Sequence, residues 1–292
     1  MQQEMVADFG VGGDSLFFVW GPYDGPFHLS RADKTGANAR VLADDLPRFS
    51  RLSVASKELF LWGFAENLRR STLDGVMTDE GFEVSGVASL SNATYAGRGG
   101  QLLERRAGTG TWEPSPWFIA AADTVLWPLA VDDRLVVFRI TEDEDAPHYE
   151  VLLVGDPSAV DGGLRTLASG NGLPTRIRGL HEVYWIVQLP NADSHSFELR
   201  RHSLDPDATT QLVASARNIT NFALDETFAY VTRTLTLSYE LLLVPVSSIS
   251  EKYRFGSHLE LMHPESVGGR LWFYDASSKR VRSVDLGLNE FL

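Results

Sequence analysis

Short runs of apolar and aromatic residues recur along the whole chain, and each run follows a small polar turn. Leu16–Trp20 follows Gly-Gly-Asp-Ser, Leu59–Trp62 follows Ser-Lys-Glu, and Val183–Val187 follows His-Glu. Seven such runs are centred near residues 17, 60, 95, 137, 185, 230 and 273, with a mean spacing near 43 residues. Gly, Asp and Asn bound the runs, and helical periodicity is nearly absent. The pattern therefore predicts hairpins of an all-β protein.

A second β-like run follows each apolar run at a short distance, so each repeat contains at least one β-hairpin. These second runs are His28–Ala32, Leu68–Leu73, Leu102–Arg106, Tyr149–Val154, Phe197–Ser203, Tyr239–Val246 and Lys279–Val284. A period of about 40–45 residues is typical of a four-stranded propeller blade. Sandwich strands would not repeat at this period, and a β-solenoid coil is shorter. We therefore predict one all-β domain over residues 1–292, a single β-propeller of seven four-stranded antiparallel blades. A six-bladed propeller is the alternative, with the short third repeat as a distorted extra blade.

The apolar run of each repeat is expected to be the second strand of its blade. Such a strand is buried on both faces, which explains why it is continuously apolar and not alternating. Aromatic residues such as Phe17, Trp20, Trp62 and Trp185 would then pack between blades. The sequence allows two ways for the ring to close. The first strand of the last blade is predicted at His258–His263, and its fourth strand comes either from Leu286–Leu292 or from Met1–Val6.

Two of the repeats resemble a known kind of blade. Leu59–Trp62 followed by Leu68–Gly75, and Val183–Trp185 followed by Leu199–Pro206, are similar to blades of the YWTD and TolB-like propeller families. In those families an apolar-aromatic strand precedes a strand that ends in a Leu-Asp-Gly-like turn. The Thr-Asp of the YWTD signature is missing from both repeats. The resemblance implies the fold and a bias toward protein or small-ligand binding, and it transfers no functional residue.

Charge and cysteine content exclude several classes of function. The net charge is −13 and no basic stripe exists, which argues against nucleic acid and against a polybasic membrane surface as partners. The chain has no cysteine, so disulfides, thiolate nucleophiles and cysteine-ligated zinc are excluded. The apolar runs are too short for a transmembrane segment, and a soluble, acidic protein is expected. An extracytoplasmic location, with a signal removed, is preferred to a cytoplasmic one, and the oligomeric state is left open.

Candidate binding residues lie in the loops that join second to third strands and successive blades. Ligands of propellers usually lie at these loops, where aromatic residues supply contact area and carboxylates supply electrostatic attraction. We predict a non-catalytic binding or scaffolding propeller, without a cofactor, whose ligand is a protein or a small molecule. The residues predicted to contact it are Tyr23, Asp24, Trp117, Glu142, Asp143, Glu144, Asp145, Asp193 and His195.

The alternative function is a metal-dependent hydrolase or lyase with a divalent cation over the central channel. Its ligands would be polar residues near the channel, namely Asn92, Asp123, Asn218 and Asn221. Asp193 and His195, together with His202, are a further candidate for a metal or a general base. No calcium loop, His-Glu-x-x-His motif, nucleophile elbow or phosphate loop occurs in the sequence. We therefore prefer the binding propeller.

Overall fold

The fold is described from a computed structural model of the chain. The described residues are 4–22, 25–34, 37–47, 51–55, 57–63, 65–107, 109–118, 123–141, 147–155, 163–190, 196–234, 239–248, 253–257, 261–267, 270–275 and 280–285. Every regular element in these ranges is a β-strand. None of the described ranges contains a helix long and apolar enough to span a bilayer.

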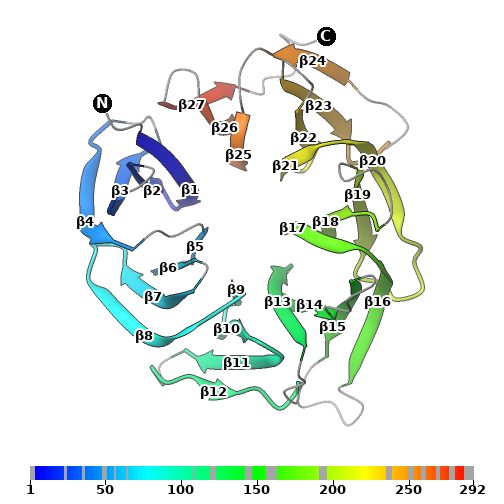
Figure 1. Cartoon of the computed structure of the whole chain (residues 1–292), viewed down its shortest axis with the longest axis horizontal. Coiled ribbons are helices and arrows are strands. Elements are labelled where there is room, and N and C mark those ends of the chain that lie inside the picture. Colours follow the sequence, from blue (N-terminus) through cyan, green and yellow to red (C-terminus); the bar gives the residue numbers. More distant parts are fainter. Residues whose placement is uncertain are drawn as a thin grey trace. The chain divides into compact units, whose positions relative to one another are not determined.

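The strands form successive antiparallel sheets, each made of strands that are consecutive in the sequence (Figure 1). Blade 1 contains β1 (Glu4–Gly12), β2 (Ser15–Pro22), β3 (Phe27–Asp33) and β4 (Arg40–Leu46). Blade 2 contains β5 (Arg51–Val54), β6 (Glu58–Gly63), β7 (Glu66–Thr72) and β8 (Met77–Glu83). Blade 3 contains β9 (Gly86–Ser89), β10 (Ala93–Arg98), β11 (Gln101–Arg106) and β12 (Glu113–Pro114). Blade 4 contains β13 (Thr124–Val131), β14 (Arg134–Thr141), β15 (His148–Val154) and β16 (Leu164–Asn171).

The remaining sheets follow the same order. Blade 5 contains β17 (Leu173–Gly179), β18 (Glu182–Gln188), β19 (Ser196–Ser203) and β20 (Gln211–Arg217). Blade 6 contains β21 (Ile219–Leu224), β22 (Phe228–Thr234), β23 (Tyr239–Pro245) and β24 (Tyr253–Ser257). Blade 7 contains β25 (Leu261–Val267), β26 (Arg270–Asp275) and β27 (Arg280–Asp285).

The predicted β-propeller fold with four-stranded antiparallel blades is confirmed. Six sheets have the full four strands, which is the count of the six-bladed alternative, and blade 7 has three strands among the described residues. The third repeat is not the distorted one, because β12 gives it a fourth strand of two residues. Of the predicted first strand of blade 7, Leu261–His263 lies in β25, and His258–Glu260 lies outside the described residues. Glu4–Val6 does not complete blade 7, since it pairs with Trp20–Pro22 inside blade 1, and Met1–Gln3 lies outside the described residues. Leu286–Leu292 lies outside the described residues.

Each apolar run is the second strand of its blade, as predicted. In β18 the five residues from Val183 to Val187 are all buried, whereas the fourth strand β20 is exposed at most positions. A second strand has sheet neighbours on both sides and packed sheets on both faces, so every side chain is shielded from water. Phe17 and Trp185 are fully buried as expected, while Trp20 and Trp62 are only partly buried.

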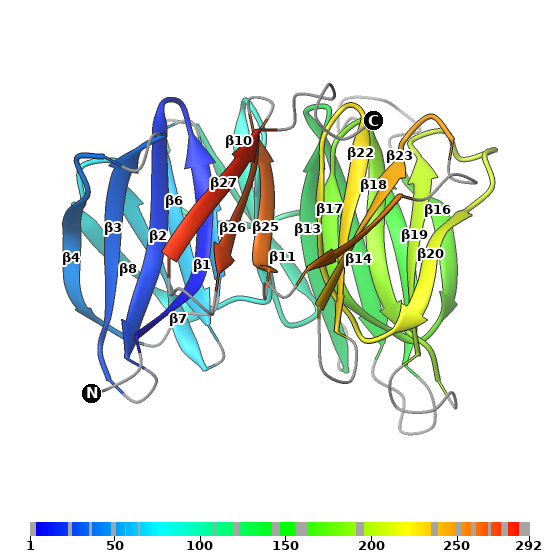
Figure 2. The ribbon, with the colours of Figure 1, turned by 90° about the horizontal axis from the view of Figure 1, so that it is seen from above.

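The chain folds into two compact units. Unit 1 comprises residues 1–84 and 259–292, and unit 2 comprises residues 85–258. In unit 1, Trp272 of blade 7 packs with Phe9 and Leu16 of blade 1. Figure 2 shows β25 to β27 beside β1 in this unit. The carboxylate of Asp8 also accepts a hydrogen bond from the backbone N–H of Leu52 in blade 2, at 2.9 Å.

In unit 2 the first strands β9, β13, β17 and β21 contact one another in sequence order (Figure 1). Trp185 lies in the largest apolar cluster, edge-on to Phe138 and Tyr149 of blade 4, with ring centroids 5.8 and 6.1 Å away. Arg200 donates a hydrogen bond of 2.7 Å to the Tyr149 hydroxyl, and Arg201 donates one of 2.6 Å to the carbonyl of Val246 in blade 6. Because neighbouring residues of a strand point to opposite faces, this dipeptide reaches both adjacent blades.

Blades 3 and 4 approach each other closely at Gly97. The Ser85 hydroxyl donates to the Leu126 carbonyl of blade 4 at 2.6 Å and lies 3.1 Å from the Gly97 carbonyl. A Cβ atom on Gly97 would lie only 1.8 Å from the Leu126 oxygen. Glycine is therefore required here by the distance between two backbones, although its own backbone is in a strand.

Candidate functional site

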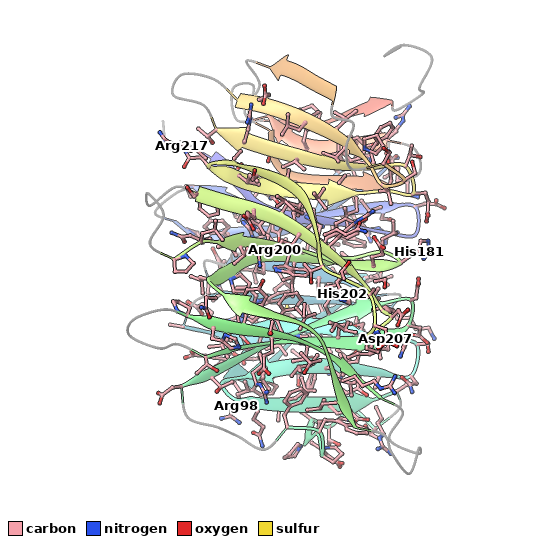
Figure 3. The ribbon with its side chains drawn as sticks, turned by 90° about the vertical axis from the view of Figure 1, so that its right-hand side faces the viewer. Arg98, His181, Arg200, His202, Asp207 and Arg217 are labelled. Atoms are coloured by element: carbon pink, nitrogen blue, oxygen red, sulfur yellow. The ribbon has the colours of Figure 1, made fainter. Side chains whose placement is uncertain are left out.

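The turns that join first to second strands carry a row of charged side chains across unit 2. We call Ser91, Asp132, Asp133, His181 and Glu226 the turn row; they come from blades 3, 4, 5 and 6 in order. All five residues are exposed. Figure 3 shows His181 and Asp207 at one end of the sheets and Arg98 and Arg217 at the other end. In unit 2 the turn row therefore lies at the end opposite the loops that join second to third strands.

The turn of blade 4 is a two-residue hairpin made by two aspartates. Asp132 and Asp133 have φ of 47° and 56°, and the flanking residues Val131 and Arg134 are paired across the turn. Positive φ at both central residues is the signature of a type I′ turn, which Asp and Asn tolerate better than other side chains. The short turn gives the two carboxylates fixed and different directions.

The turn of blade 6 is organised by Asp225. One carboxylate oxygen of Asp225 accepts the backbone N–H groups of Thr227 and Phe228, both at 2.7 Å. The other oxygen accepts the Tyr230 hydroxyl at 2.5 Å. Burial and this carboxylate raise the pKa of Tyr230, so the phenol stays protonated. Asp225 is thus a structural residue that fixes the turn, and its neighbour Glu226 is left to point outward.

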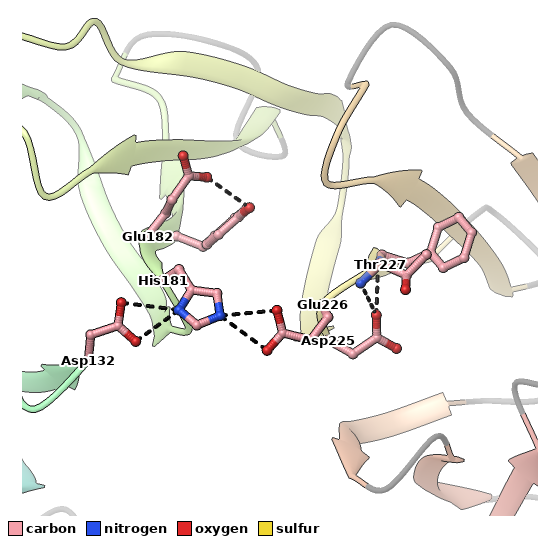
Figure 4. Close-up of polar contacts among 8 residues, drawn as sticks. Asp132, His181, Glu182, Asp225, Glu226 and Thr227 are labelled. Carbon is pink, nitrogen blue, oxygen red and sulfur yellow. Dashed lines mark hydrogen bonds and ion pairs between the residues drawn. The ribbon is translucent and has the colours of Figure 1, made fainter.

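His181 joins three blades. Its Nδ1 lies 2.9 Å from a carboxylate oxygen of Asp132, and its Nε2 lies 3.0 Å from one of Glu226 (Figure 4). Asp133 turns the other way and accepts the backbone N–H and the hydroxyl of Ser91, at 2.6 and 2.5 Å. The chain of contacts from Ser91 to Glu226 therefore crosses four successive blades.

The pKa values of the turn row reflect these contacts. The hydrogen bond and charge of Asp132, and then those of Glu226, raise the pKa of His181. The two hydrogen bonds from Ser91 lower the pKa of Asp133. Imidazolium is favoured because only the protonated ring can donate to both carboxylates. The two carboxylates contact different ring nitrogens on opposite sides, so this arrangement suits a charged bridge better than a shared metal ion.

Removing either carboxylate should lower the pKa of His181, and Asp132→Asn should lower it more than Glu226→Gln, because Asp132 is the larger cause. The pKa is read from the imidazole proton shifts of His181 in an NMR titration. A larger effect of Glu226→Gln would contradict the geometry.

The same bridge should make stability depend on pH. Because folding raises the pKa of His181, the bridge stabilises the folded state fully below about pH 6.5. This stabilisation is lost as the pH rises through the pKa that His181 has in the folded state. The stability difference between wild type and His181→Gln should therefore be larger near about pH 5.5 than near about pH 8 in urea unfolding. An equal difference at both pH values would exclude a charged bridge.

The sequence-predicted binding residues lie almost entirely outside the described residues. Trp117 is the exception: it lies in the connection from β12 to β13, is partly buried, and packs against the apolar cluster of Phe118 and Leu126. The others are Tyr23, Asp24, Glu142, Asp143, Glu144, Asp145, Asp193 and His195. Their role stays a prediction.

The residues of the metal-dependent alternative are spread over both ends of the sheets. Asn92 lies in the turn before β10, whereas Asp123 and Asn218 immediately precede the first strands β13 and β21. Asn221 is buried in β21, where its side-chain oxygen accepts the N–H of Phe222 at 2.9 Å. Asn92 therefore lies at the opposite end from Asp123 and Asn218. Among the described residues no three His, Asp or Glu side chains gather as metal ligands.

His202 serves the fold and is not free to bind a metal. It is buried, and its ring nitrogens lie 2.6 Å from the Ser203 carbonyl and 3.0 Å from the Ala208 carbonyl. Both nitrogens are therefore engaged with the backbone of the turn between β19 and β20.

Comparison with known proteins shows the fold of the chain but does not assign it to a family. No family model and no curated protein matches the chain. The β-propeller domain of the Trilobed protease from Pyrococcus furiosus is similar, with TM-score 0.64 and 9% identity over 97% of this chain and 95% of that one. A structure from a study of two prolyl endopeptidases gives TM-score 0.67 and 12% identity over 98% of this chain and 47% of that one. TolB from Acinetobacter baumannii gives TM-score 0.54 and 9% identity over 84% of this chain and 65% of that one.

These similarities, together with the four-stranded sheets, define the class of protein as a β-propeller. The chain spans 47% of the prolyl endopeptidase and 65% of TolB. At identities this low the likeness shows the fold alone.

Proposed function

We propose that the chain is a non-catalytic binding or scaffolding propeller that presents exposed side chains at the ends of its sheets to a protein or small ligand. The observation that carries the proposal is the turn row, in which exposed side chains from four blades, charged in three of them, are held on short turns. Such side chains lose little conformational freedom on binding, which favours affinity. Charged groups at the rim of an interface mainly set the orientation and rate of association.

The similarity to propellers of peptidases supports this role. The solved propeller of the Trilobed protease is a domain of a larger protein, and it matches nearly the whole of this chain. A propeller of this kind can bind or position other components without carrying the chemistry itself. In unit 2 the sequence-predicted residues Trp117, Glu142, Asp143, Glu144, Asp145, Asp193 and His195 would form a second surface at the opposite end of the sheets. An extracytoplasmic location is part of the same proposal.

The proposal is tested by comparing the two ends. A tagged chain is purified from its native cells, and the molar ratio of any co-purifying protein or ligand is measured by mass spectrometry. One variant carries Asp132→Asn and Glu226→Gln; a second carries Trp117→Ala with Glu142→Gln and Glu144→Gln. Glu83→Gln, on the exposed strand β8, is the matched control.

We expect wild type and Glu83→Gln to retain a partner at a constant ratio, and one of the two variants to lose at least about 80% of it, since rim charges mainly act through electrostatic attraction. Equal retention by all four proteins would contradict a role for either end. A melting temperature raised by a divalent cation and lowered by EDTA, together with substrate turnover, would instead support the metal-dependent hydrolase or lyase.

A further inference from the structure

Arg176 on β17 has a buried guanidinium nitrogen without a hydrogen-bond partner. Its Nη1 is shielded from solvent and bonded to nothing within the described residues, although the side chain as a whole is only partly buried. A buried donor costs free energy unless water or an ion satisfies it.

Four other partly buried arginines of the strands have carboxylate partners. Arg70 pairs with Glu80, Arg139 with Glu150, Arg200 with Glu198, and Arg233 with Glu240. Arg139 and Glu150 are direct cross-strand neighbours, as are Arg233 and Glu240. In three of these pairs the glutamate lies on an adjacent strand, whereas Glu198 lies two residues before Arg200 on the same strand.

Arg176 has no neighbouring carboxylate among the described residues at its position in the sheet. Its cross-strand neighbour is Ile186, which is fully buried in the apolar second strand. β17 is the first strand, so no strand of blade 5 lies on its other side. No carboxylate among the described residues pairs with it. Neither Ile186 nor Arg178, the next residue on the same face of β17, supplies a carboxylate.

A second guanidinium lies on the same face of the strand. Arg178 is two residues further along β17, and its guanidinium lies 6.0 Å from the ring centroid of Phe222 on β21. Residues two apart share a face, so Arg176 also lies on the face turned toward blade 6. The register shifts between Pro174 and Arg176, and a bulge of this kind redirects the side chain that follows it.

We propose that Arg176 anchors a binding site for a small oxyanion, a carboxylate or a phosphate group. The planar guanidinium matches two oxygen atoms of either group. The site deepens the small-ligand part of the proposed function and rests on it. It is separate from the turn row, so its failure would leave the partner-retention experiment unchanged.

The test is thermal unfolding of the whole chain in sodium chloride and, at matched ionic strength, in inorganic phosphate or in succinate. Arg176→Met and Arg176→Lys are compared with Arg165→Met, a control at an exposed position of β16. At about 100 times the Kd, the anion should raise the melting temperature of wild type and Arg165→Met by several degrees. Arg176→Met should lose this rise yet melt no lower than wild type in chloride, because the unpaired donor is gone.

The outcomes separate a site from a general salt effect. A rise of equal size in wild type and Arg176→Met would overturn the proposal, since excluded anions stabilise any folded protein. No rise of wild type with either anion would also overturn it. A rise with one anion only identifies the group that is bound. If Arg176→Met does not fold, calorimetry with Arg176→Lys decides: we expect an affinity loss of at least about tenfold, since lysine lacks the planar fork, and an unchanged affinity would refute the site.

Discussion

Replacing Trp185 with alanine is expected to lower the free energy of unfolding by about 3–5 kcal/mol. Trp185 is fully buried in the cluster shared by blades 4 and 5, with aromatic neighbours in edge-on contact. The substitution removes the apolar surface that the indole hides from water and leaves a cavity that rigid strands cannot close. The loss is measured by urea unfolding, followed through circular dichroism of the strands.

Two further variants distinguish packing from ring chemistry at this position. Trp185→Phe keeps an aromatic ring and removes the indole N–H, which is buried without a partner among the described residues; it should cost less than about half as much as Trp185→Ala. Trp112→Ala removes a partly exposed indole next to Arg105 and should cost about 1 kcal/mol or less. Similar losses for Trp112→Ala and Trp185→Ala would show that the cluster does not dominate the stability of unit 2.

Gly97→Ala should be the most damaging single-methyl addition, with an expected loss of about 3 kcal/mol. The new Cβ would lie 1.8 Å from the carbonyl oxygen of Leu126 and 2.6 Å from the Ser85 hydroxyl. The first contact is with backbone, so relief requires blades 3 and 4 to separate locally. That movement also breaks the hydrogen bond from Ser85 to Leu126.

Gly86 provides a matched control because it is the cross-strand partner of Gly97. A Cβ on Gly86 would meet its nearest atom, in Pro128, at 3.5 Å, which is ordinary contact. Gly86→Ala should therefore change the free energy of unfolding by less than about 1 kcal/mol, with a tendency to stabilise, since alanine has less freedom in the unfolded chain. Equal destabilisation by the two substitutions would contradict the close approach at Gly97.

The second strands could be located from sequence because they are the most constrained part of each blade. All seven apolar runs fall within second strands, and each following run overlaps a third strand. First and fourth strands were harder to place. Fourth strands such as β8 are mostly exposed and carry mixed polar residues, so no clear hydrophobic pattern marks them. The two-residue strand β12 leaves no pattern at all, which is why the third repeat is short in the sequence.

The turn row could not be assembled from the sequence, although its residues stand in the polar turns that mark the repeats. In the sequence Asp132, His181 and Glu226 indicate only where a hairpin turns. Equivalent turns of successive blades lie side by side, so opposite charges at one repeat position predict contacts between blades. What sequence cannot give is the direction of each side chain, which depends on turn type: the positive φ of Asp132 and Asp133 sends one carboxylate to each neighbour.

The arginine pair at residues 200 and 201 has a consequence for how unit 2 comes apart. In many repeat proteins each unit is held only by nearest-neighbour interfaces and can detach from an end. Here one dipeptide in blade 5 bonds to Tyr149 on one side and to the carbonyl of Val246 on the other. Moving that strand strains both interfaces at once. Blades 4, 5 and 6 should therefore unfold together as one cooperative unit, and not one blade at a time.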